Sequence, residues 1–274
     1  MIDRERALAI QQRALHDLMV FLGGAEPHSR LVERDGVTAA IVPATPTRSL
    51  PNSVTYADAG RLAASLDELA GEYESAGVDA WTVWTPDFDR EAAAALEGAG
   101  HVLDGGPAAM ILELDGFEVP DPGDLDHDSE ADVATLGALN DVAYGDAHGP
   151  GLAPSFARRP EALDLRLYRA LVGGEVASVL CTIDHLHPGG DAPRDPPAQA
   201  GPGGGPDCGI YFVATHPSFR GRGLATRLLA VALAGARERG CATSSLQASP
   251  MGEPLYAGLG YQRCFRLHMY ERRN

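Results

Sequence analysis

Residues 209–225, GIYFVATHPSFRGRGLA, decide the fold, because they join a strand to a helix through a turn that contains two glycines. The β-branched and aromatic run 210–213 predicts a strand, and the segment 216–218 (His-Pro-Ser) ends it. Apolar side chains then recur at helical spacing until Gly240 stops the helix. The members of this apolar stripe are Leu224, Leu228, Leu229, Val231, Leu233 and Ala236.

The turn places Gly221 and Gly223 at the start of that helix. Free backbone N–H groups and the positive end of the helix macrodipole face outward there, and the missing Cβ atoms let an anion approach the main chain. Other nucleotide motifs are excluded. The chain has no G-x-x-x-x-G-K-[ST] run, and no G-x-G-x-x-G followed by an acidic residue in a second strand. The turn therefore predicts a pyrophosphate site that belongs neither to a P-loop kinase nor to a dinucleotide dehydrogenase.

Three more elements follow the helix. Residues 241–248 predict a short strand, 252–259 one or two helical turns, and 261–270 a final strand or hairpin. The short helix carries Tyr256, four residues before the pair Gly260-Tyr261.

The turn fits the pattern [RQ]-x-x-G-x-[GA] at Arg220, Gly223 and Ala225. With the Tyr-x-x-x-Gly-aromatic motif and the order of elements, residues 208–262 resemble the GNAT superfamily of N-acetyltransferases. The chain departs from that family at Ser249, followed by proline, where many members place Asn at the end of the second strand.

This resemblance implies that the second half of the chain binds acetyl-CoA as acyl donor. Main-chain groups of the strand would pair with the pantetheine like an added strand, and an N–H there would polarise the thioester carbonyl. The implied cofactor-binding residues are Val213, Ala214, Thr215, Arg220, Gly221, Arg222, Gly223, Leu224, Ala225 and Thr226.

The resemblance also gives Tyr256 the role of general acid. A phenol with a pKa of about 10 stays protonated at neutral pH and can protonate a thiolate whose conjugate acid has a pKa of about 8.5. The alternative for Tyr256 is a core aromatic on a short helix.

The general base has no assignment from sequence. The candidates lie in or beside predicted loops, no spacing singles one out, and a lone loop histidine is usually solvated. The amine can also lose its proton through a chain of waters. In the loop 145–154, Asp146 and His148 are candidate acceptor contacts or ordinary loop polarity, and the Gly/Pro-rich segment 186–207 predicts an irregular excursion between two strands. The candidate bases are His148, Glu175, His185, His187, Asp207 and His216.

Residues 1–117 are predicted to repeat the fold in degenerate form. The segment 51–55, at the place of the anion turn, holds no glycine pair, so we expect acetyl-CoA only in the second half. An unrelated α+β domain is the alternative. The expected elements are a helix at 2–21, a hairpin across Asp35-Gly36, a helix at 59–76, a strand at 80–84, a helix at 90–99 and a closing hairpin through Gly105-Gly106.

The predicted fold class is α+β, with two GNAT-like domains in tandem, each a mixed, mostly antiparallel sheet flanked by helices. The acidic, turn-rich segment 118–128 is the expected linker, and residues 129–274 the catalytic domain. This layout is similar to that of mycothiol synthase, in which one half is intact and the other decayed.

Composition agrees with a cytoplasmic enzyme of two domains in 274 residues. A net charge of −16 argues against nucleic acid as a partner, because phosphate backbones need clustered cations. The chain shows neither a membrane-spanning apolar run nor a secretory signal, and its four cysteines lack the C-x-x-C spacing of a metal site.

The predicted activity is acetyl transfer from acetyl-CoA to a primary amine. Small molecules, amino acids and protein amines stay open as acceptors, and the oligomeric state is unassigned. Two alternatives are a non-catalytic acyl-CoA-binding sensor and an assembly module that uses the first half as a partner-binding face.

Overall fold

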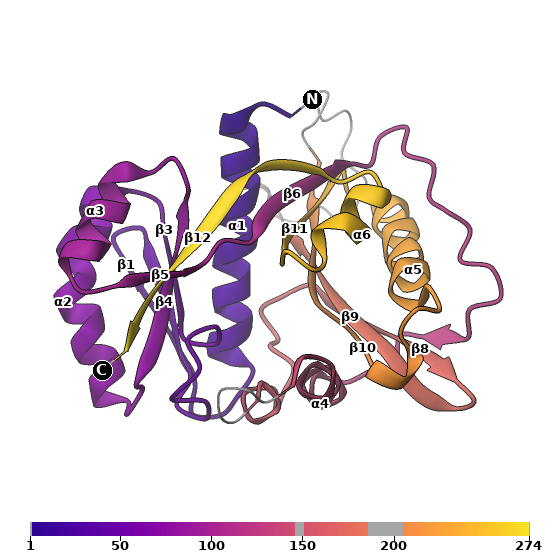
Figure 1. Ribbon diagram of the computed structural model, residues 1–274, viewed down its shortest axis with the longest axis horizontal. Helices are drawn as coiled ribbons and strands as arrows, with labels where there is room; N and C mark the ends of the chain where they lie inside the picture. Colours follow the sequence, from indigo (N-terminus) through magenta and orange to yellow (C-terminus); the bar gives the residue numbers. More distant parts are fainter. Residues whose placement is uncertain (1, 146–150, 186–204, 274) are drawn as a thin grey trace.

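Helices and strands alternate along the residues that the computed structural model describes, 2–145, 151–185 and 205–273 (Figure 1). The first half contains α1 (Arg4–Gly24), β1 (Arg30–Arg34), β2 (Val37–Ile41), β3 (Ser53–Tyr56), α2 (Ala59–Ser75), β4 (Ala80–Pro86), α3 (Arg90–Gly98), β5 (Val102–Gly105) and β6 (Ala108–Glu113). The second half contains β7 (His127–Asp128), α4 (Val133–Tyr144), β8 (Leu165–Val172), β9 (Glu175–His185), β10 (Asp207–Thr215), α5 (Leu224–Glu238), β11 (Thr243–Ala248), α6 (Glu253–Gly258) and β12 (Gln262–Arg273).

The strands form one mixed sheet in the order β1-β2-β3-β4-β12-β6-β11-β10-β9-β8-β7, with β5 also paired to β12. Most neighbours are antiparallel. The parallel pairs are β3 with β4 and β10 with β11, and each pair is connected through a helix, α2 or α5. The predicted mixed, mostly antiparallel sheet with flanking helices is confirmed, and the strand–helix–strand unit occurs once in each half.

The two halves exchange strands. β6 lies in the first half of the chain but pairs with β11 from Thr243↔Glu113 to Ala248↔Ala108. β12 pairs first with β6 and then with β4, from Leu267↔Pro86 to Arg273↔Ala80. Hydrogen-bonded pairing therefore crosses the predicted linker at 118–128, and each half contributes a strand to the sheet of the other.

The predicted hairpin through Gly105-Gly106 is wrong. Instead, β5 and β6 follow one another along β12, both antiparallel to it, with Leu267 N–H bonded to Pro107 C=O at 2.9 Å between them. The physical reason is burial: five of the six residues of β6 are buried, so the strand needs a partner on both sides, and β11 and β12 supply them.

Helix α1 stands between the two parts of the sheet (Figure 1). It packs in the largest hydrophobic cluster, where the Phe21 ring meets that of Phe156 edge-on at 5.2 Å. Its Gln11 side chain donates to the C=O groups of Met110 in β6 and Leu246 in β11. Residues of the first half thereby reach the sheet of the second half.

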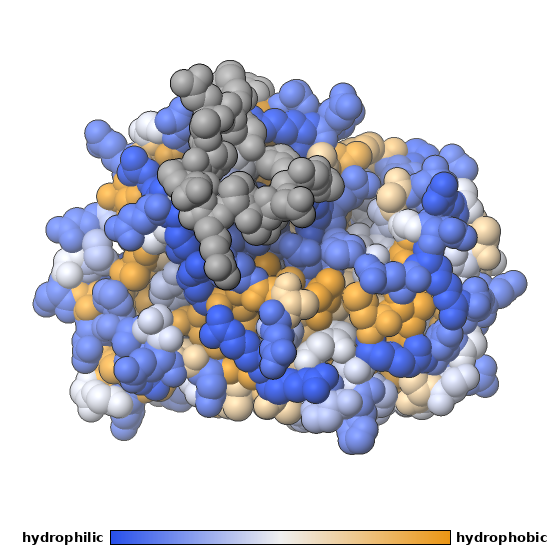
Figure 2. Space-filling view, turned by 180° about the vertical axis from the view of Figure 1, so that it is seen from behind, coloured by the Kyte–Doolittle hydropathy of each residue, from blue (hydrophilic) through white to orange (hydrophobic). Residues whose placement is uncertain are grey.

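The surface is largely hydrophilic. On the face opposite to that of Figure 1, hydrophilic residues predominate and hydrophobic residues lie in patches between them (Figure 2). Within the described part of the chain, no helix combines the length and the apolar character that a membrane span requires.

Candidate active site

A groove opens where β10 and β11 separate. The two strands pair only from Asp207↔Thr243 to Gly209↔Ser245, and beyond that point they diverge. The space between them, about 400 Å³, is bounded by α4 on one side and by α6 on the other. Such a divergence leaves main-chain groups of β10 without a strand partner on the groove side.

A bulge in β10 shapes the wall of this groove. Phe212 and Val213 together stand opposite Leu180 of β9, and Phe212 has a positive φ of 53°. Asn140 of α4 donates to the Phe212 carbonyl at 3.0 Å and so fixes the bulge. After the bulge, the N–H of His216 points to Ala177 of β9. Because strand N–H groups alternate in direction, those of Val213 and Thr215 face the groove.

Carbonyls of β10 accept hydrogen bonds from side chains on both sides of the strand, from α4 on the groove side and from β9 on the other side. The Tyr144 hydroxyl donates to Val213 C=O at 2.7 Å, and the Ser178 hydroxyl donates to Ala214 C=O at 2.9 Å. Tyr144 is 55% exposed at the end of α4. A ligand that pairs with the Val213 carbonyl meets the Tyr144 phenol at the same oxygen.

The turn before α5 matches the local structure expected from its glycines. Gly221 and Gly223 adopt φ values of 75° and 70°, and a Cβ added at either would meet no atom within 4 Å. Gly223 is the N-cap residue of α5 and provides no side-chain cap. The first helical N–H groups, those of Leu224, Ala225 and Thr226, have no intrahelical acceptor. They are available to an anion.

Arginines surround this turn and give it a local positive charge in an acidic protein. Arg220 donates to Ala143 C=O and, through Nε, to Thr215 C=O at 3.4 Å, so it ties α4 to β10. The guanidinium of Arg222 lies over the Phe219 ring, 5.3 Å from its centre. Of these two arginines, Arg222 is the one whose side chain donates to no main-chain acceptor among the described residues.

In the first half, an aspartate side chain caps the helix start that corresponds to the start of α5. Helix α2 follows β3 as α5 follows β10, but its N-cap is Asp58, whose carboxylate accepts from Arg61 N–H at 2.9 Å. Helices α1, α3 and α4 likewise begin at an aspartate cap. A carboxylate in that place repels a second anion, so the first half lacks the exposed amide cradle of α5.

Tyr256 of α6 lines the groove. Its ring meets Tyr261 edge-on at 5.9 Å, and its hydroxyl has no hydrogen-bond partner among the described residues. Burial, and then the neighbouring Tyr144, raise the pKa of the Tyr256 phenol above its usual value. The phenol is therefore neutral and its proton is available to a group in the groove. Near the same helix, Ser249 accepts from Gly252 N–H at 3.2 Å.

The candidate bases that the structure describes fall outside the groove. Of those described, Glu175, His185, Asp207 and His216 are absent from its lining. His185 and Asp207 are buried rather than solvated, because they lie on paired ends of β9 and β10. Burial raises the pKa of Asp207, whose carboxylate accepts from Thr243 and Ser245. Asp146, His148, His187 and most of the segment 186–207 lie outside the described residues.

His185 belongs to a hydrogen-bonded network behind the groove. Its Nδ1 lies 2.6 Å from an oxygen of Asp17, and its Nε2 lies 2.9 Å from the Tyr211 hydroxyl. That hydroxyl donates its proton to Ala14 C=O at 2.8 Å, so Nε2 must donate to it. The network anchors the wall of the groove, at Tyr211, to helix α1.

Several residues that line the groove could not be predicted from the sequence. Leu18, Leu50 and Trp84 come from the first half of the chain, and Asn140 and Tyr144 from α4. Their positions depend on α1 packing against β11 and on the exchanged strands, which leave no local sequence signal. The predicted residues Val213, Thr215, Arg220, Ala225 and Tyr256 do line the groove, while the glycines of the turn lie next to it.

Comparisons with known proteins agree with this geometry. Residues 143–261 match the Acetyltransferase (GNAT) family. No curated protein sequence matches the chain.

Among solved structures, a GCN5-related N-acetyltransferase from Kribbella flavida covers 99% of this chain and 95% of its own, at 15% identity and a TM-score of 0.62. A tandem GNAT protein from the clavulanic acid biosynthesis pathway covers 99% and 97%, at 12% identity and a TM-score of 0.54. A GCN5-related N-acetyltransferase from Sphaerobacter thermophilus covers 87% and 80%, at 16% and 0.51. Residues 143–261 therefore belong to the Acetyltransferase (GNAT) family, and the chain as a whole has the fold of a tandem GCN5-related N-acetyltransferase.

Proposed function

We propose that the groove between β10 and β11 binds acetyl-CoA and that the acetyl group passes from it to a primary amine. The observation that carries this proposal is the uncapped start of α5, at Gly223, beside a strand pair that diverges after Gly209. The free N–H groups at the start of the helix suit a diphosphate. The unpaired strand edge suits the amide-containing arm that follows the diphosphate.

In this proposal the pyrophosphate lies on the N–H groups of residues 221–226, with Arg222 as a neighbouring cation. The pantetheine amides pair with the N–H groups of Val213 and Thr215. The pantetheine meets the Tyr144 hydroxyl at the Val213 carbonyl, where the two groups share or compete for the same oxygen.

The transfer step needs one proton donor from the protein. The neutral amine nitrogen attacks the thioester carbonyl carbon, a C–N bond forms and the C–S bond breaks. A β10 N–H polarises the carbonyl oxygen, and Tyr256 gives its proton to the departing CoA thiolate. The proton lost by the amine passes to water, and a proton from solvent restores the phenol.

The acceptor enters from the side that the first half of the chain provides. Leu18, Leu50 and Trp84 make this wall apolar. An apolar wall favours the neutral form of an amine over its ammonium form, because burial disfavours the charged state. Small-molecule amines, amino acids and protein amines all supply such a nucleophile.

Calorimetric titration of the full chain with acetyl-CoA tests the binding part of the proposal. We expect one equivalent to bind, because Asp58 fills the corresponding helix terminus in the first half. The full chain is required, since the halves share strands β6 and β12. Binding of two equivalents, or of none, contradicts the proposal.

A non-catalytic acyl-CoA sensor is the second candidate. It is favoured by one observation: none of the described candidate bases lines the groove. Tyr256 distinguishes the two functions, because a sensor needs no proton donor at the thiolate. If acetyl-CoA binds tightly and no amine in a broad panel releases CoA, the sensor replaces the enzyme.

A further inference from the structure

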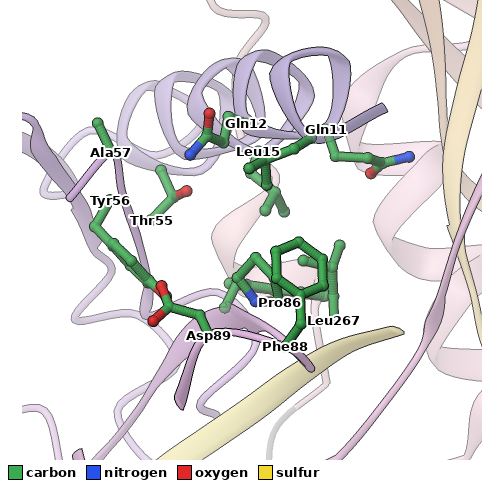
Figure 3. A pocket seen from close by; sticks show the side chains of 12 residues that line it. Gln11, Gln12, Leu15, Thr55, Tyr56, Ala57, Pro86, Phe88, Asp89 and Leu267 are labelled. Atoms are coloured by element: carbon green, nitrogen blue, oxygen red, sulfur yellow. The ribbon is translucent and has the colours of Figure 1, made fainter. Parts of the chain in front are cut away.

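A second cavity, of about 300 Å³, lies in the first half of the chain between α1 and the ends of β3 and β4 (Figure 3). β3 and β4 pair only at Ser53↔Thr82 and Val54↔Val83 and then diverge, as β10 and β11 do. The cavity therefore occupies the place in the first half that the acetyl-CoA groove occupies in the second. Its volume is at the lower end of the range for small-molecule sites.

Apolar side chains form most of the walls of this cavity, and Gln11, Gln12 and Thr55 add polar groups to them. Figure 3 shows Gln12 and Leu15 of α1 on one side and Pro86, Phe88 and Leu267 on the other. Trp84 also lines it, and its indole Nε1–H donates to the Ser53 hydroxyl at 2.9 Å, which fixes the ring. Such walls bind the apolar body of a ligand.

One carboxylate interrupts these walls. Among the described residues that line the cavity, Asp89 is the one charged side chain. One of its oxygens caps α3 through Ala92 N–H at 3.0 Å, and the other accepts from the Tyr56 hydroxyl at 2.7 Å. Each oxygen keeps a second acceptor position. Both existing contacts are donors, so they fix the carboxylate in place without neutralising its charge.

The ligand chemistry follows from these surroundings. Asp89 and the Asp58 cap of α2 both disfavour an anion, so a diphosphate has no place here. Arg4, outside the lining, holds its guanidinium 5.3 Å from the centre of the Phe88 ring, so one face of this ring already contacts a cation. A fixed carboxylate beside aromatic and aliphatic walls is complementary to an ammonium on an apolar body.

We infer that this cavity binds a small molecule with one primary ammonium group and an apolar body, with the ammonium on Asp89 and the body against Trp84, Phe88 and Leu8. The site is distinct from the acetyl-CoA groove. Trp84 lines both spaces, and a bond of 2.8 Å from the Gln247 side chain to that of Gln11 joins their walls. The inference does not rest on the proposed acetyl transfer.

Calorimetry on the full chain tests the inference with 2-phenylethylamine as probe and 2-phenylethanol as its uncharged counterpart. Asp89→Asn keeps the shape of the side chain and the cap of α3 but removes the charge. We expect it to weaken binding of the amine at least about tenfold and to leave binding of the alcohol unchanged. Asp87→Asn, a neighbouring carboxylate outside the cavity lining, serves as the matched control and should change neither.

A second variant locates the bound amine. Gln12→Phe places a ring over the cavity from α1, far from the phosphate turn, and should abolish amine binding while acetyl-CoA titration stays at its parental value. The inference is overturned if the amine does not bind, if it binds Gln12→Phe as well as the parent, or if Asp89→Asn weakens amine and alcohol equally. Acetyl-CoA binding decides the proposed function separately.

Discussion

Gly223→Val tests the anion cradle at the start of α5. Gly223 has a φ of 70° and a ψ of 12°, a left-handed conformation, and an added Cβ there would meet no protein atom within 4 Å. Valine therefore has room in the free protein, but its side chain stands where a pyrophosphate would approach the main chain. The variant should fold and lose acetyl-CoA affinity.

The size of both effects follows from the geometry. A non-glycine residue in the left-handed region costs about 1–2 kcal/mol, which sets the expected loss of stability. A hydrogen bond to a charged group contributes about 1.5–3 kcal/mol, so loss of one such N–H bond to phosphate weakens binding roughly tenfold to a hundredfold. The stability cost alone leaves the protein folded, so weaker acetyl-CoA binding by the variant would report the lost contact with the phosphate.

Gly240→Val is the matched control at the other end of α5. Gly240 has a φ of 81° and equally open space around its Cβ position, but it lies at the C-terminal end of the helix. Thermal unfolding should shift by a similar amount in both variants, and calorimetry should show weaker acetyl-CoA binding in Gly223→Val alone. Equal affinities in the two variants would refute the placement of the pyrophosphate.

Three further predictions concern single side chains. Tyr256→Phe should lower single-turnover acetyl transfer by ~10²- to 10⁴-fold with unchanged acetyl-CoA affinity, and a parental rate would make Tyr256 a core aromatic. Tyr144→Phe frees the Val213 carbonyl and should tighten acetyl-CoA binding about two- to tenfold, whereas weaker binding would give the phenol a direct role. Burial raises the pKa of Asp17, but bonds from His16 and His185 outweigh it and lower that pKa from 3.8 to about 2. Between about pH 4 and about pH 2 the unfolded chain therefore binds more protons at Asp17 than the folded chain does, so the protein loses stability as the pH falls through this range. This loss, measured by urea unfolding, should be smaller in Asp17→Asn.

Local patterns predicted the second half of the fold well. The strand before the turn, the helix to Glu238 and the short helix around Tyr256 lie where periodicity and turn residues placed them. These signals are local, because a glycine at positive φ and a helical apolar stripe are both set by neighbouring residues. The same holds for the helices and most strands of the first half.

Long-range pairing was the part that the sequence did not reveal. A Gly-Gly pair predicts a hairpin at 105–106, yet β5 and β6 continue along β12, which is long enough at twelve residues to pair with both. Strand exchange depends on which edges are free in the folded chain, and no residue pattern records that. For the same reason Trp84, in a strand of the first half, gave no sign that it lines two cavities.

The residues of the candidate site also divide into those with a local sequence signal and those placed by tertiary contacts. The glycines of the turn and Tyr256 carry recognisable spacings, and the groove brings Tyr256 and Val213 to one space. Tyr144 and Asn140 reach that space because α4 packs on β10, a tertiary contact. His185 looked like a solvated loop histidine because its partners, Asp17 and Tyr211, are distant in sequence.

We propose that this chain transfers an acetyl group from acetyl-CoA to an amine. The most direct test incubates the full chain with acetyl-CoA and a broad panel of amines, follows the free CoA thiol, and identifies the acetylated product by mass. We expect thiol release that depends on one class of amine, is matched by an equal amount of N-acetylated product, and is strongly reduced in Tyr256→Phe. Tight acetyl-CoA binding without thiol release for any amine would contradict it.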